Sequence, residues 1–102
     1  MRGKAKGAEF PLGRGENFVG RWDAELGSFP EIDLEPHDPE ALVSRSHAVL
    51  RFEDGELTVE DLGSMNGTYL NRGKRLEKNT RAQLKQCDEL VFGKTFLKVQ
   101  KA

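Results

Sequence analysis

The sequence feature that most constrains the fold is a pair of short apolar-alternating segments joined by the dipeptide Asp54-Gly55. Asp-Gly between two alternating segments is a strong signal for a β-hairpin, because these residues tolerate the positive φ of a tight turn. We therefore expect paired strands over His47–Phe52 and Glu56–Leu62. The alternation predicts that two apolar sets lie on different faces: Ala48, Leu50 and Phe52 on one, and Leu57 and Val59 on another.

A polar run stands at each open end of this hairpin. Ser44-Arg45-Ser46-His47 opens the first strand, and Ser64-Met65-Asn66-Gly67-Thr68 follows the second. Because a hairpin returns the chain to where it started, the two runs should meet at one end of the same sheet. A cation and hydroxyls from one run, beside a side-chain amide from the other, suit an oxyanion attached to a peptide. This pattern predicts binding of a phosphorylated protein.

The rest of the chain shows short β-rich segments separated by Gly, Pro, Asp and Asn, with little helical periodicity. Many short strands with polar turns favour an all-β sandwich over a βαβ fold. In a sandwich the loops gather at two ends, so we expect a shallow surface site on a loop cluster. The first two further strands are expected to pair through a turn at residues 13–16. The further strands expected are Glu9–Leu12, Asn17–Gly20, Ile32–Leu34, Thr68–Leu70, Lys74–Leu76, Thr80–Leu84, Glu89–Phe92 and Thr95–Val99.

Size and charge limit the function classes. The chain has 102 residues, enough for one domain with one core. Its 16 Lys and Arg residues nearly balance 17 Asp and Glu residues, whereas general nucleic-acid binders are usually basic, so we expect no nucleic-acid partner. No stretch suits a membrane span or a signal peptide, so we expect no membrane contact. We also expect a monomer. The single cysteine, Cys87, cannot form an internal disulfide and favours a cytoplasmic location.

The N-terminal end carries Arg2, Lys4 and Lys6 but no apolar run. We predict that residues 1–8 are a flexible end or a truncated first strand, because terminal residues are usually solvated. A basic nucleic-acid arm is the alternative. The β-sandwich domain is predicted over residues 9–100.

Several short motifs follow one another over most of the chain: Gly20-Arg21, Ser44-Arg45-Ser46-His47-Ala48, Asp61-Leu62-Gly63-Ser64-Met65-Asn66-Gly67-Thr68, Asn71, Leu84, Asp88, Leu90 and Phe92-Gly93. In this order they resemble the forkhead-associated (FHA) domain family. The long Trp22–Asp38 connection is similar to that of bacterial members. The resemblance implies a β-sandwich of about eleven strands, and recognition of phosphothreonine in partner proteins during signalling. It also implies a module taken from a longer protein.

The resemblance implies that Arg21, Ser44 and Arg45 bind the phosphate. A guanidinium offers a planar fork of donors and keeps its charge, and the hydroxyl of Ser44 can donate to another oxygen. Taken without the surrounding motifs, Arg21 is a surface residue and Ser44 a turn residue. Arg45 is either a second phosphate contact or a solvated arginine.

The resemblance also implies peptide contacts by Ser64, Met65, Asn66 and Asn71. The amide of Asn66 can donate and accept at once, which suits an extended peptide backbone; a plain Asn-Gly turn is the alternative. Asn71 has either a supporting or a peptide-contacting role. Support of the site is expected from Gly20, His47, Gly67 and Thr68.

Two positions depart from the family's usual pattern. Arg72 stands before Gly73 where an Asn-Gly pair is common, and it either reaches an acidic ligand side chain or is solvated. Cys87 stands before Asp88 where glycine is common, so that turn is strained or of another type.

Ser44 and His47 also suggest a nucleophile and its base, but no third orienting group or nucleophile-elbow pattern accompanies them. In the family this histidine is structural. His37, His47 and Cys87 lack metal-ligand spacing. The sequence therefore predicts a module with no catalytic residue, no metal and no cofactor. The alternative function is a phosphate-independent interaction scaffold using the same sandwich.

Overall fold

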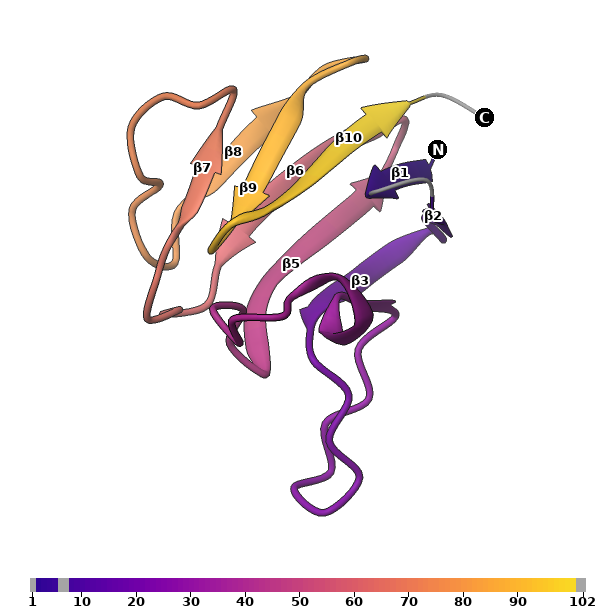
Figure 1. The fold of residues 1–102 in the computed structure, drawn as a ribbon. Helices are drawn as coiled ribbons and strands as arrows, with labels where there is room; N and C mark the ends of the chain where they lie inside the picture. The colour runs from indigo at the N-terminus through magenta and orange to yellow at the C-terminus, as the bar shows by residue number, and fades with distance from the viewer. Residues whose placement is uncertain (1, 6–7, 101–102) are drawn as a thin grey trace.

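Two five-stranded sheets face one another in this computed structural model, which describes residues 2–5 and 8–100, with side chains for residues 9–100 (Figure 1). The strand order is β2-β1-β10-β9-β7 in one sheet and β4-β3-β5-β6-β8 in the other. The predicted all-β sandwich is confirmed, with ten strands in the described ranges. The elements are β1 (Arg2–Ala5), β2 (Ala8–Pro11), β3 (Gly15–Gly20), β4 (Ile32–Asp33), the 3₁₀ turn η1 (Glu35–His37), β5 (Ser46–Glu53), β6 (Glu56–Asp61), β7 (Thr68–Leu70), β8 (Arg81–Leu84), β9 (Glu89–Phe92) and β10 (Thr95–Gln100).

The central hairpin is β5 and β6, as predicted. Asp54 and Gly55 have φ values of 52° and 76°, so both turn residues take the positive φ that a tight hairpin requires. Leu50 lies opposite Val59 and Phe52 opposite Leu57, so each pair shares a face of the sheet. The prediction that the two apolar sets lie on different faces was therefore wrong, because directly opposed residues in a ladder point to the same side.

Two predicted strand arrangements were also wrong. The segments expected to pair first belong to different sheets, since β2 pairs with β1 and β3 pairs with β5. The Asn17 amide bonds to both Gly13 N and Gly13 O, which holds a corner between the sheets. Lys74–Leu76 forms no strand; only an isolated bridge joins Tyr69 to Arg75. Arg75 turns its guanidinium onto the Ser64 carbonyl instead of continuing a ladder.

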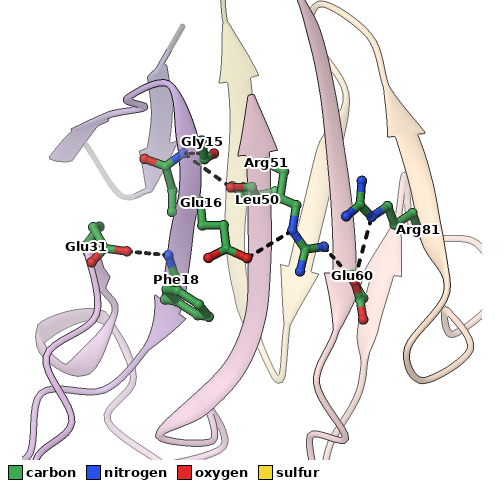
Figure 2. Close-up of polar contacts among 9 residues, drawn as sticks. Gly15, Glu16, Phe18, Glu31, Leu50, Arg51, Glu60 and Arg81 are labelled. Carbon is green, nitrogen blue, oxygen red and sulfur yellow. Dashed lines mark hydrogen bonds and ion pairs between the residues drawn. The ribbon is translucent and has the colours of Figure 1, made fainter. Parts of the chain in front are cut away.

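The inner faces of the two sheets bury the apolar side chains, among them Leu50, Val59, Phe92 and Leu97, each 0% exposed. The outer face of the β3–β5–β6–β8 sheet is charged. Figure 2 shows Arg51 between Glu16 and Glu60, at 3.2 and 2.6 Å, with Arg81 approaching Glu60 from β8. The sheet therefore has the half-buried, half-solvated alternation that the sequence shows.

Three connections extend from one end of the sandwich. The arm (residues 21–31) links β3 to β4 and projects away from the sheets in Figure 1. The central loop (residues 38–45) precedes β5, and the Asn66 loop (residues 62–67) follows β6. At the N-terminus, β1 pairs with both β2 and β10, so the described part of residues 1–8 includes a paired strand, while residues 1, 6 and 7 lie outside it.

Candidate functional site

Direct hydrogen bonds join the central loop to both of its neighbours. Arg21 Nε donates to the carbonyl of Val43 at 2.6 Å, and the backbone N–H of Met65 donates to Ser44 Oγ at 3.2 Å. Asn66 Nδ2 donates to the carbonyl of Leu42 at 2.9 Å. The prediction that these loops share one end of the sandwich is confirmed, and the guanidinium, hydroxyl and amide lie around one loop.

Gly20 lets β3 approach the central loop. A Cβ atom at Gly20 would lie 1.8 Å from the carbonyl oxygen of Arg45, which no side chain can tolerate. The ladder between β3 and β5 shifts register at this point, and the backbone N–H of Arg21 donates to the same carbonyl at 3.3 Å. Arg21 is half-buried, and only its Nε is engaged by a described residue, so its terminal nitrogens stay available to a ligand.

Arg45 is held from the arm. Its Nε lies 2.8 Å from Asp23 Oδ2, and its side chain is 50% exposed. The hydrogen bond from Arg45 lowers the pKa of the Asp23 carboxyl below its ordinary value. Arg45 therefore presents a cation beside Ser44 that is oriented by one ion pair and still open to solvent.

His47 joins the central loop to the Asn66 loop. The ring is 0% exposed, and its Nδ1 accepts a hydrogen bond of 3.0 Å from the backbone N–H of Ser44. That acceptor role fixes the proton on Nε2, which donates to the Gly67 carbonyl at 2.8 Å. Burial lowers the pKa of His47, which favours the neutral ring that this pattern requires.

Asp61 orders the Asn66 loop from the end of β6. Its carboxylate accepts from Ser64 Oγ at 2.5 Å, Thr68 Oγ1 at 2.8 Å, and the backbone N–H groups of Gly63 and Ser64 at 2.9 and 3.0 Å. Burial raises the pKa of Asp61, but these hydrogen bonds outweigh it, so the pKa lies below its ordinary value. Ser64 is only 5% exposed, and its hydroxyl also accepts from Gly67 N–H, so its side chain serves the loop's own structure.

Asn71 lies at the far end of β7 from the Asn66 loop. Its amide donates to Asp88 Oδ1 at 3.0 Å and accepts from the backbone N–H of Glu89 at 2.8 Å. The side chain thus ties the β7 turn to the start of β9. Met65, in contrast, is 83% exposed beside Ser44, and Asn66 is exposed next to it.

Two residues that order the site were missed from the sequence. The carboxylate of Asp38, which is 7% exposed, accepts from the N–H groups of Leu42 and Val43, both at 2.9 Å. An aspartate next to Pro39 was a signal for such a turn. Arg75 donates to the Ser64 carbonyl at 2.7 Å and packs over Gly67, where an added Cβ would lie 2.6 Å from its Nε. No local pattern marked Arg75, because the contact depends on the folded course of the chain.

The sequence model of the FHA domain matches residues 13–93. The chain therefore belongs to the FHA domain family, whose members are protein-interaction modules. A solved structure from a study of phosphothreonine-dependent FHA domain interactions is similar, with 25% identity and a TM-score of 0.80 over 99% of this chain and 95% of that one.

Curated bacterial relatives are similar over most of this chain. The oxoglutarate dehydrogenase inhibitor of Corynebacterium glutamicum is 40% identical over 94 residues, which cover 91% of this chain and 56% of that protein. The glycogen accumulation regulator GarA of Mycolicibacterium smegmatis is 39% identical, with coverage of 91% and 51%. The chain spans about half the length of these relatives. Within the described ranges, no helix has the length and apolar character needed to cross a membrane.

Proposed function

We propose that this module binds a phosphothreonine of a partner protein through Arg21, Ser44 and Arg45. Asn66 and Met65 would lie beside the peptide backbone. The observation that supports this most is that three of these residues bond to the central loop. Arg21 Nε donates to the Val43 carbonyl, Met65 N–H to Ser44 Oγ, and Asn66 Nδ2 to the Leu42 carbonyl. Ser64 is proposed as a support of the loop rather than a side-chain contact, and Asn71 as an anchor of the β7 turn.

The available groups suit a phosphate dianion. Phosphothreonine carries about −1.5 to −2 charge at neutral pH. Charge-assisted hydrogen bonds contribute roughly 1.5–3 kcal/mol each, so three or four give a gross gain of about 5–12 kcal/mol. Ordering of the peptide takes back several kcal/mol. The remainder corresponds to a dissociation constant on the order of micromolar.

We infer that the module is not an enzyme. Both ring nitrogens of His47 are engaged by backbone groups, so the ring holds no position from which to take the Ser44 proton. Ser44 Oγ accepts from Met65 N–H, which orients the hydroxyl as part of a receptor. Its relatives carry the names of an inhibitor and a regulator, so we propose that this chain brings a regulatory protein to phosphorylated partners in the cytoplasm.

The test is a peptide array with random flanks around either phosphothreonine or threonine. The wild-type protein should bind the phosphorylated members at micromolar affinity and the threonine members at least about tenfold more weakly. Arg21→Ala and Ser44→Ala should each remove this difference, whereas Arg14→Ala, a change in an exposed residue before β3, should retain it. Equal binding of phosphorylated and unphosphorylated members would instead support the phosphate-independent scaffold.

A further inference from the structure

A small hollow of about 200 Å³ lies between the arm and Arg45. Its apolar walls are Phe18, Phe29 and Pro30, and its polar rim includes Arg45 and Ser46. Pockets for drug-sized molecules occupy about 300–1,000 Å³, so this hollow suits a smaller group. Phe18 and Phe29 are 39% and 54% exposed, which is a large apolar exposure beside a charged receptor.

The walls of the hollow are held in place by contacts within the protein. Phe29 stacks edge-to-face on Trp22 at a ring distance of 4.8 Å, and the backbone N–H of Trp22 donates to Asp33 Oδ1 at 3.0 Å. Figure 2 shows Glu31 reaching the backbone nitrogen of Phe18, at 2.6 Å, which ties the end of the arm to β3. A preformed apolar wall costs little ordering when a partner side chain enters.

The arm is hydrogen-bonded to the backbone of two proposed phosphate-binding residues, Arg21 and Arg45. Backbone hydrogen bonds of 2.9 and 2.8 Å close the arm between Asp23 and Ser28. Ser28 Oγ lies 3.0 Å from the carbonyl of Arg21 and 3.3 Å from that of Arg45. The hollow and the phosphate receptor therefore share Arg45, and a chain that binds one passes close to the other.

The residues that line the hollow give it a side. They come from the arm, from Phe18 on β3 and from Arg45 and Ser46, and Asn66 is not among them. Asn66 bonds to Leu42 and lines a separate hollow with Tyr69 and Phe96. A peptide that crosses at Ser44 with Asn66 on one flank therefore meets the arm hollow on its other flank. An extended chain advances about 3.3 Å per residue, so a residue within about three positions of the phosphothreonine reaches the hollow.

We propose that this hollow is a subsite for an apolar side chain of the phosphorylated segment, on the flank of the phosphothreonine away from Asn66. The proposal rests on the proposed function. It identifies the preferred partner as a phosphothreonine segment with a leucine- or phenylalanine-like residue on one flank.

The test is a positional scan of phosphothreonine peptides, in which each of the three positions on either side carries Leu, Phe, Ser or Asp in turn. Wild-type protein should prefer Leu or Phe over Ser by about five- to tenfold, at positions confined to one flank. Phe29→Ser should lose this preference while binding the Ser-containing peptides as wild type does. Leu26→Ser is the matched control, because Leu26 is 65% exposed on the same arm but does not line the hollow.

Two outcomes overturn the subsite, and they are distinct from failure of the proposed function. A scan with no apolar preference, or a preference that persists in Phe29→Ser, removes the subsite while phosphate-dependent binding stands. Equal binding of peptides with phosphothreonine and threonine removes the proposed function and the subsite with it. Circular dichroism of each variant checks that the sandwich is intact.

Discussion

The Nε2–H group of His47 donates a 2.8 Å hydrogen bond to the carbonyl of Gly67, and through this ring the Asn66 loop is bound to the central loop. The other ring nitrogen accepts from Ser44 N–H at 3.0 Å. The same buried side chain therefore fixes the backbone of a proposed phosphate contact and the base of the loop that presents Asn66. This explains why a histidine is needed at a position with no role in chemistry.

Replacing His47 should destabilise the domain. His47→Leu would leave Ser44 N–H and the Gly67 carbonyl without their partner, and each unsatisfied buried group costs about 1–3 kcal/mol, so we expect a loss of about 2–4 kcal/mol in the free energy of unfolding. Urea denaturation at pH 7.5 measures it. A loss below about 0.5 kcal/mol would show that the two loops hold together without the ring.

His47 should also make stability depend on pH. Burial places its folded-state pKa below the ordinary 6.5, so the unfolded chain binds the proton more readily. The contribution is fully present above pH 6.5 and is lost as pH falls from there through the folded pKa. Asp23 and Asp61, whose pKa values are lowered, change the pH dependence of stability only below about pH 4. Urea midpoints between pH 7.5 and 5 should fall more steeply for wild type than for His47→Leu; parallel slopes would contradict this.

The close approach of β3 to the central loop predicts a large effect at Gly20. In Gly20→Ala the new Cβ would lie 1.8 Å from the Arg45 carbonyl, so the bulge must open, at a cost of about 3 kcal/mol or more. Gly13→Ala is the control, because its Cβ would meet only Asn17 Oδ1 at an ordinary 3.8 Å. Thermal unfolding of both variants compares them. A Gly20→Ala protein as stable as Gly13→Ala would mean that β3 can move away freely.

The fold class and the loop cluster were predictable because their signals are local. Asp54-Gly55 fixes the central hairpin, and a hairpin brings its two ends together whatever the rest of the chain does. The corner at Gly13 was not predictable, since the Asn17 amide that holds it looks like any strand residue in the sequence. Arg75 was missed for the same reason. Its partner, the Ser64 carbonyl, is eleven positions away and is reached only after the chain has folded.

Cys87 lies in the turn before β9, at a position where glycine is common in the family, and we expect it to strain this turn. Cys87 has φ of 71°, in the left-handed region, and the Asp88 N–H closes the turn on the Lys85 carbonyl at 3.1 Å. A residue with a Cβ is destabilised by about 1–2 kcal/mol at such a φ. Glycine avoids this strain, but its more flexible unfolded chain offsets about 0.4–1 kcal/mol of the gain. Cys87→Gly should therefore stabilise by roughly 0.5–1 kcal/mol. Cys87→Ala, which removes only the thiol, should not; equal midpoints of the two variants would refute strain at this turn.

Arg75 should affect ligand affinity although it is not proposed to touch the ligand. Arg75→Ala removes the hydrogen bond to the Ser64 carbonyl and the cover over Gly67, so the Asn66 loop should become less ordered. We expect phosphopeptide affinity to fall by about three- to tenfold, with the larger part in the dissociation rate. The control is Arg81→Ala. The Arg81 guanidinium lies on the outer face of the sheet, 4.0 Å from Glu60. Equal affinities of the two variants would mean that Arg75 has no part in holding the loop.

The charge of the ligand predicts how binding depends on pH. The second ionisation of phosphothreonine has a pKa near 6, so between pH 7.5 and 5 the ligand changes from a dianion to a monoanion. The change in charge therefore falls on the ligand, and affinity should decrease by about tenfold. Because His47 lowers stability over the same range, each titration needs a parallel circular dichroism measurement to show that the protein remains folded. Constant affinity in a folded protein would mean that the site does not distinguish the two charge states, and that hydrogen bonds common to both carry recognition.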